Sequence, residues 1–249
     1  MSQTELPRVY ELRTLIADPC NPDAYFQNFD ASLLDEPLKK KVWLAREREL
    51  QCLDANSWSQ LKAEAQPHLT KRDGSGRGWQ QLIAILNQAR GHNFLTNLGC
   101  SGVQFIPRAN QLGRRTPDLE AKLDGRQILC EVKTFWESEE EIARRRNGGV
   151  GTTTDCLSLE FLKKLSAVLL DAKEQLCAHN GSFNTRWFAF IVPNFDDSLA
   201  EYKAKYFLQI DQFLSKNPEP KLEIVFFNQW TGFQVEVAMQ NAVVINEAG

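Results

Sequence analysis

Residues 116–135 read TPDLEAKLDGRQILCEVKTF, and this stretch decides the fold. Two strand-like runs flank the dipeptide Asp124-Gly125. Asp-Gly is a strong signal for a two-residue hairpin, because a type I′ turn needs positive φ at both central positions. We therefore predict an antiparallel hairpin in which Leu123 faces Arg126 and Ala121 faces Ile128. Further from the turn, Leu119 faces Cys130 and Asp118 faces Glu131.

Side chains alternate across a strand, so the predicted hairpin has one apolar face and one face that carries charges. Asp118, Glu131 and Lys133 fall on the charged face. Facing residues have Cβ atoms roughly 4.5–5.5 Å apart, and two like charges at that distance are destabilising. A divalent cation between the two carboxylates would relieve the repulsion, and oxygen ligands of this kind suit Mg²⁺ or Mn²⁺.

The alternative is a solvent-exposed face with a loose salt bridge. The run ILCEVKTF is too apolar for a strand with one wet face, so we expect Glu131 and Lys133 to be partly buried. Partly buried charges need partners or a metal ion.

The spacing of these charges resembles a nuclease signature. Pro117-Asp118, then twelve residues, then Glu131-Val132-Lys133 is similar to the pattern of the PD-(D/E)XK nuclease superfamily, which has the restriction-endonuclease-like fold. The surrounding order is similar as well: a helix over 78–91, a strand over 102–107, the hairpin, a helix over 157–181 and a strand over 187–193. The resemblance covers about residues 75–195 and implies an α/β fold, a mixed β-sheet flanked by helices.

The resemblance implies a role for each matching residue. Asp118 and Glu131 would hold the Mg²⁺ or Mn²⁺ ion, with the backbone carbonyl of Val132 as a third ligand. Lys133 would position the attacking water and stabilise the charge that develops on the phosphate.

The chain departs from the family pattern on the helix before the hairpin. Many members carry a glutamate there, whereas this helix offers Gln80 and Gln81 as supporting residues. Glu120, on the charged face of the hairpin, is an additional candidate ligand, which leaves the number of metal ions open. On the long helix after the hairpin, Lys163, Lys164 and Gln175 are further candidates, with a solvated helix face as the favoured alternative.

Two regions are predicted. Residues 1–74 form a helical N-terminal region, and residues 75–249 form the PD-(D/E)XK nuclease-like α/β domain. The segment HLTKRDGSGRG (68–78) has the composition of a loop or linker and marks the boundary.

The distribution of charge is uneven along the chain. The net charge is −3, yet residues 75–135 carry eight Lys and Arg against four Asp and Glu, a local net charge of +4. A positive field suits an anionic ligand such as DNA. Candidate contacts to the DNA backbone, with plain surface roles as the alternative, are Arg114, Arg115, Arg144, Arg145 and Arg146.

Other classes of protein are disfavoured. The six cysteines include no CxxC pair and no Cys/His cluster, which argues against a zinc or iron–sulfur site and for free thiols. No apolar run approaches the ~20 residues of a membrane span. The N-terminal residues lack the apolar segment of a secretory signal, so we expect a cytoplasmic protein.

The sequence thus predicts a metal-dependent endonuclease that hydrolyses DNA phosphodiester bonds, of a restriction or repair type, with RNA as an alternative substrate. A second hypothesis is a catalytically silent nuclease-fold module that binds nucleic acid or serves in assembly. A third is an α/β protein unrelated to nucleases. Acidic segments at both ends are compatible with a homodimer or a protein partner.

Overall fold

The computed structural model describes residues 4–18, 20–31, 36–73, 78–107, 115–135, 155–182, 184–193, 200–227 and 234–236. The chain divides into two compact units, Met1–Phe105 and Ile106–Gly249. The domain boundary predicted between residues 74 and 75 stays a prediction, since residues 74–77 lie outside the described part of the chain.

The first unit is built mainly from helices. Phe26 contacts the rings of Tyr25, Phe29 and Trp43, with centroids 5.0 to 5.6 Å apart, which forms an aromatic cluster in this unit. Its described elements are α1 (Pro7–Thr14), α3 (Pro37–Gln51), α4 (Ala55–Ala65), the 3₁₀ turn η1 (Gln66–His68), α5 (Gln80–Asn97) and β1 (Ser101–Phe105).

The helix predicted over 78–91 is longer than expected. It begins at Gln80 and continues past Gly91 to Asn97, so the predicted end at Gly91 is wrong. Phe94 and Leu95 are buried and extend the apolar surface of the helix beyond the glycine, and this packing outweighs the weak helix propensity of a single glycine.

The predicted hairpin is confirmed in the second unit. Strands β2 (Leu119–Leu123) and β3 (Arg126–Phe135) pair in the expected register, with Leu123 opposite Arg126 and Leu119 opposite Cys130. Asp124 and Gly125 have φ angles of 50° and 76°, the left-handed values that a type I′ turn requires.

Within the second unit, the strands of the mixed sheet are ordered β2-β3-β4-β5-β6. Strand β4 (Thr185–Pro193) runs parallel to β3, and β5 (Leu222–Phe227) runs parallel to β4. The short β6 (Gln234–Glu236) is antiparallel to β5. Parallel neighbours need long crossover connections, and these contain helices α7 (Leu159–His179) and α8 (Ala200–Lys216). The second unit is therefore a mixed α/β structure, as predicted.

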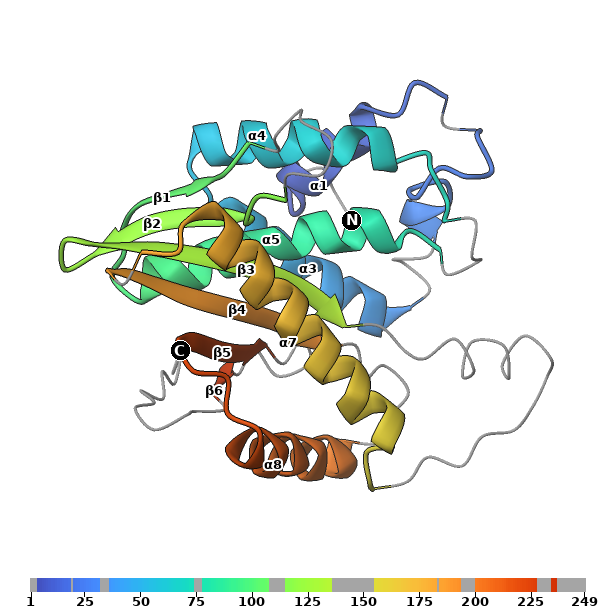
Figure 1. The fold of residues 1–249 in the computed structure, drawn as a ribbon. Coiled ribbons are helices and arrows are strands. Elements are labelled where there is room, and N and C mark those ends of the chain that lie inside the picture. Colours follow the sequence, from blue (N-terminus) through green and yellow to red (C-terminus); the bar gives the residue numbers. More distant parts are fainter. Residues whose placement is uncertain are drawn as a thin grey trace. The chain divides into compact units, whose positions relative to one another are not determined.

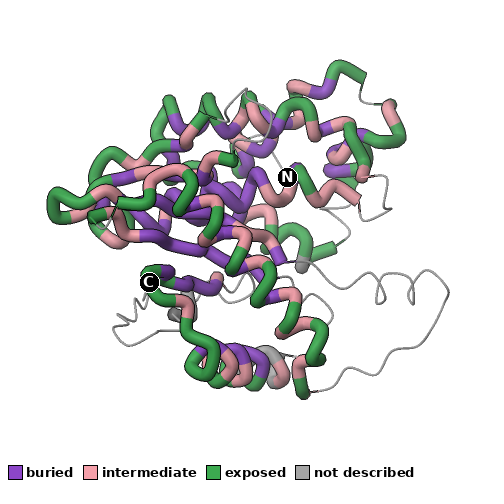
Figure 2. Tube along the Cα trace, in the orientation of Figure 1, coloured by how far each residue is buried: buried purple, intermediate pink, exposed green. Residues whose placement is uncertain are grey.

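Helices α7 and α8 lie on the same side of this sheet (Figure 1). Alternate residues of β3, β4 and β5 form a buried cluster with the apolar stripes of both helices, including Leu129, Leu169, Ile191, Ile210 and Phe226. Strands β3 and β4 are buried along most of their length (Figure 2). Because Leu129, Glu131 and Lys133 alternate on the strand, the charged face of the hairpin is the face that α7 covers.

Two further expectations can be compared with the structure. All six cysteines are free thiols, and Cys100 and Cys130 are buried. None of the helices that the structure describes has the length and apolar character to cross a membrane.

Candidate active site

Asp118 lies immediately before β2 and is half-buried. Its backbone carbonyl accepts a hydrogen bond from the N–H of Ile106 (2.9 Å). Its side-chain Oδ2 accepts a hydrogen bond from the backbone N–H of Val132 in β3 (2.8 Å). The carboxylate is thereby fixed against the strand that carries Glu131 and Lys133.

Pro117 leaves the Val132 carbonyl without a donor from the neighbouring strand. A ladder continued beyond Leu119 and Cys130 would place residue 117 opposite Val132 in the next hydrogen-bonded pair. Proline has no N–H, so residue 117 cannot donate a ladder hydrogen bond to the Val132 carbonyl. The N–H of Val132, which would donate to the carbonyl of residue 117 in such a pair, donates to the side chain of Asp118. The N–H and carbonyl of one strand residue point to the same side, so the Val132 carbonyl is directed toward this side of β3 too.

Glu131 is in the middle of β3, between the hairpin partner β2 and the parallel strand β4. The residue is only 4% exposed. Its Oε1 atom pairs with the Nζ of Lys133 at 2.8 Å. Its Oε2 atom is buried and has no hydrogen-bond partner among the described residues. A buried carboxylate oxygen without a partner is costly, and it marks a place where a cation would be favourable.

The electrostatics of Glu131 agree with this geometry. Burial, and then the negative charge of Asp118, raise the pKa of Glu131 to about 8, against the opposing influence of Lys133. The two carboxylates therefore lie close enough to repel each other, as the register predicted. The raised pKa means that the metal-free site favours the uptake of a positive charge at Glu131, either a proton or a cation.

Lys133 is the centre of the polar contacts. Its Nζ lies 2.8 Å from Glu131 Oε1, 2.8 Å from Asp171 Oδ2 and 3.3 Å from Gln175 Oε1. Burial lowers the pKa of Lys133, but the carboxylates of Glu131 and Asp171 outweigh it, so the pKa lies above its ordinary value. We call Asp118, Glu131, Lys133 and Asp171 the carboxylate–lysine cluster.

Helix α7 supplies the part of the site that the sequence did not predict. Asp171 was missed, and the solvated role favoured for Gln175 is wrong, since this side chain contacts Lys133. The two residues are four apart and therefore share one side of the helix, next to the buried stripe formed by Leu165, Leu169, Ala172 and Leu176. That spacing groups Asp171 with the candidate Gln175, but it does not by itself show that the shared side of the helix faces Lys133. Lys163 and Lys164 were the other two candidates on this helix. The Nζ of Lys164 lies 5.1 Å from the ring centroid of Phe135.

The other predicted residues are less closely tied to the cluster. Glu120 contacts Gln127, with 3.5 Å between Oε2 and Nε2, and Arg115 is exposed and pairs with Asp171. Gln80 and Gln81 begin α5 in the first unit, so their part in the site stays a prediction. Four predicted arginines lie outside the described residues: Arg114, Arg144, Arg145 and Arg146.

The donor set fits a hard divalent cation. Within the described ranges, no group of three or more His, Cys, Asp or Glu side chains is arranged to hold a metal ion. A site here would therefore combine the carboxylates of Asp118 and Glu131 with a backbone oxygen, and the Val132 carbonyl stays the predicted one. Oxygen donors of this kind, with waters completing the shell, suit Mg²⁺ or Mn²⁺.

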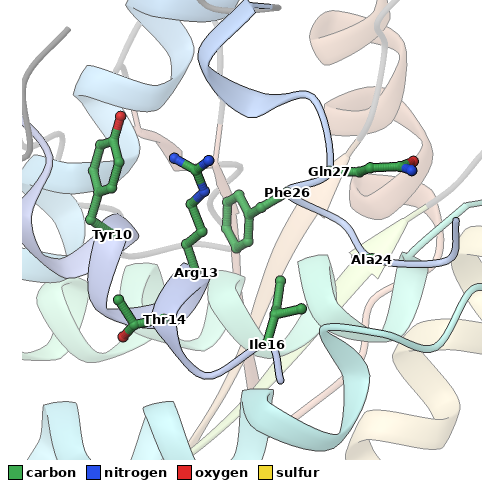
Figure 3. Close-up of a pocket in the computed structure, with 7 residues that line it drawn as sticks. All are labelled: Tyr10, Arg13, Thr14, Ile16, Ala24, Phe26 and Gln27. Carbon is green, nitrogen blue, oxygen red and sulfur yellow. The ribbon is translucent and has the colours of Figure 1, made fainter. Parts of the chain in front are cut away.

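A pocket of about 430 Å³ lies in the first unit, between α1 and residues 24–27 (Figure 3). Its charged lining residue is Arg13, which is already paired with Asp30 at 2.7 Å. Asp30 also accepts a hydrogen bond from the hydroxyl of Tyr10. Because these polar groups satisfy one another, the pocket offers a ligand less than the carboxylate–lysine cluster does.

Comparisons with known proteins add little. No family model and no curated protein matches the chain. Among solved structures, the chain is similar to SfsA from Pyrococcus furiosus in complex with Ca²⁺, with 14% sequence identity and a TM-score of 0.24. The match covers 63% of this chain and spans 60% of the length of that one. A likeness of this extent carries no argument about fold or function. Any argument about function therefore depends on the geometry of the site.

Proposed function

We propose that the chain is a metal-dependent endonuclease that hydrolyses DNA phosphodiester bonds on a restriction-endonuclease-like α/β domain. The observation that carries the proposal is the buried, unpaired Oε2 of Glu131 beside Asp118, with Lys133 on the other oxygen of the same carboxylate. A structural salt bridge needs only Glu131 and Lys133. A second carboxylate facing Glu131 in a mostly buried strand makes sense when the two share a cation.

Each residue of the cluster has a distinct part in this proposal. Asp118 and Glu131 hold Mg²⁺ or Mn²⁺, together with the carbonyl of Val132. The bound metal supplies Lewis acidity to the phosphate and orients the reacting groups. The hydrogen bond from Val132 to Asp118 fixes one of the two carboxylates before any metal arrives, so little reorganisation is needed.

Lys133 provides the positive charge for the reaction. Hydrolysis forms a bond from the water oxygen to phosphorus and breaks the bond to the leaving oxygen, while negative charge builds up on the phosphate. When Glu131 binds the cation, the N–H that it accepts from Lys133 in the metal-free protein becomes available to the attacking water or to a phosphate oxygen. A fixed charge in a partly buried site stabilises the transition state better than a solvated one.

One exposed basic residue at the edge of the cluster supports a nucleic-acid substrate. Arg115 is exposed and lies on Asp171, at the edge of the cluster. Phosphate contacts from arginine position a nucleic acid without reading its sequence. We therefore assign DNA as the substrate class and expect its binding to weaken as the salt concentration rises.

The proposal is tested by incubating the protein with supercoiled plasmid and with single-stranded DNA, each with Mg²⁺, with Mn²⁺ or with EDTA. We expect cleavage with either metal, none with EDTA, and none by Asp118→Ala or Lys133→Ala. Glu174→Gln is the matched control for Asp118→Ala. Glu174 is exposed on α7, and its substitution by glutamine also removes one negative charge. Wild-type protein that binds Mn²⁺ in calorimetric titration yet cleaves neither substrate would overturn the enzymatic assignment.

A further inference from the structure

The ammonium of Lys133 is saturated with acceptors. A lysine ammonium has three N–H donors. The structure places three acceptors around it: Glu131 from β3, and Asp171 and Gln175 from α7. Lysine has a long flexible stem, so an isolated lysine would not hold one position. Here the acceptors come from two different elements, and the ammonium is fixed between the strand and the helix.

Asp171 is itself held firmly. Its Oδ2 faces Lys133 and its Oδ1 faces Arg115, so each oxygen has its own cationic partner. One turn further along α7, the amide of Gln175 donates from Nε2 to the carbonyl of Thr116 (2.6 Å), which turns its Oε1 toward Lys133. The buried stripe of α7 fixes the helix on the sheet, so both side chains project from a rigid support.

The two carboxylates that contact Lys133, those of Glu131 and Asp171, have different roles once a cation is bound. If Glu131 binds a cation, as the proposed function requires, part of its negative charge is engaged by that cation. Asp171 then becomes the remaining carboxylate on Lys133, and its Oδ2 already lies 2.8 Å from the ammonium.

We propose that Asp171 is the positioning residue of Lys133: from α7 it holds the ammonium in its working place while Glu131 is engaged by the metal ion. This inference rests on the proposed nuclease function, because it assigns the ammonium to the reacting phosphate. Asp171 does not touch substrate or metal in this role. Loss of an outer partner that orients a metal ligand typically lowers activity by about 10–100-fold, and we expect an effect of the same order for the partner of Lys133.

The test compares Asp171→Asn, Asp171→Glu and the control Glu174→Gln in the full chain. Plasmid cleavage with Mg²⁺ gives kcat and KM, and calorimetric titration gives the affinity for Mn²⁺. A third measurement needs neither metal nor activity: metal-free protein is treated briefly with acetic anhydride, and acetylation of Lys133 is followed by peptide mass spectrometry. Circular dichroism confirms that each variant is folded.

We expect Asp171→Asn to lower kcat by about 10–100-fold with KM changed by less than about 2-fold. Acetylation of Lys133 should become several-fold faster, as expected for an ammonium that has lost a partner. Asp171→Glu should restore part of kcat and part of the protection of Lys133 from acetylation. Glu174→Gln should behave as wild type. Affinity for Mn²⁺ should not change in any of the three.

Three outcomes would overturn the inference: unchanged acetylation of Lys133 in Asp171→Asn, a change in KM alone, or weaker binding of Mn²⁺. A change in KM alone would mean that Asp171 acts through Arg115 on DNA binding, and weaker Mn²⁺ binding would make Asp171 a ligand. If wild-type protein cleaves no DNA, the proposed function fails, and the acetylation rates still decide whether Asp171 holds Lys133.

Discussion

The carboxylate of Asp118 accepts a 2.8 Å hydrogen bond from the backbone N–H of Val132, one step beyond the last ladder pair of the hairpin, Leu119 with Cys130. The side chain thereby substitutes for a main-chain acceptor. Asp118 has two separable duties: it completes the hydrogen bonding of β3, and its charge faces Glu131. Substitutions can remove one duty and keep the other.

Asp118→Asn is expected to keep the structural duty and lose the chemical one, because an amide oxygen still accepts from Val132 but carries no charge. Asp118→Ala loses both, and an N–H left without an acceptor costs about 1–3 kcal/mol. Urea unfolding in EDTA should therefore rank Asp118→Asn near wild type and Asp118→Ala well below it, while neither variant binds Mn²⁺ in calorimetric titration. Equal loss of stability in both would contradict the structural duty.

Pro117→Ala tests whether the proline keeps the Val132 carbonyl available. Alanine supplies an N–H at the position opposite Val132, which the proline cannot do. We expect the new donor to bond this carbonyl and to compete with a cation for it. The affinity for Mn²⁺ should fall, while the free energy of unfolding in EDTA stays the same or rises. Pro117→Ala with unchanged Mn²⁺ affinity would remove the carbonyl from the ligand set.

Glu131→Gln should stabilise the metal-free protein even though it abolishes activity. Glu131 is buried with one oxygen unpaired, and burial raises its pKa, so the folded chain holds this carboxyl at a cost in free energy that a neutral amide of the same shape avoids. Chemical unfolding in EDTA measures the change. Glu223→Gln is the control, because Glu223 on β5 is exposed and paired with Arg186. A less stable Glu131→Gln would show that the salt bridge to Lys133 outweighs burial.

The hairpin was predictable because its information is local. The Asp-Gly turn fixes the register, and the register alone places Asp118 beside Glu131. The contribution of α7 was not predictable in the same way. Asp171 lies 38 positions after Lys133, and nothing in its immediate neighbours distinguishes a solvated aspartate from one that binds a lysine. Only the packing of α7 on β3 decides which side of the helix faces the site.

The end of α5 illustrates the same limit at the level of secondary structure. Gly91 carries the local signal of a helix end, and a local rule places the end there. Phe94 and Leu95 bury their side chains beyond it, so tertiary packing overrides the local preference. Local rules therefore located the elements of this chain better than they located where each one ends.

A pH-dependent prediction concerns His92, a buried residue of α5 in the first unit. Its Nε2 lies 3.3 Å from the hydroxyl of Ser57, and burial lowers the pKa of His92 against the opposing charge of Asp54. In the unfolded chain the imidazole has its ordinary pKa near 6.5. At a pH between the pKa of His92 in the folded chain and its pKa in the unfolded chain, the imidazole is protonated mainly in the unfolded chain. Acidification therefore favours unfolding. The contribution of neutral His92 is present above about pH 6.5 and is lost as the pH falls.

His92→Gln removes this titration while keeping a polar side chain of similar size. We expect the free energy of unfolding of wild type relative to His92→Gln to decrease as the pH falls from 7.5 to 5.5, by at most about 1.4 kcal/mol per pH unit, the limit for one proton. Glu131 and the other carboxylates titrate in both proteins, so the difference between the two isolates the histidine. Urea unfolding at several pH values measures it. A difference that is constant over this range would mean that His92 is protonated equally in the folded and unfolded chain.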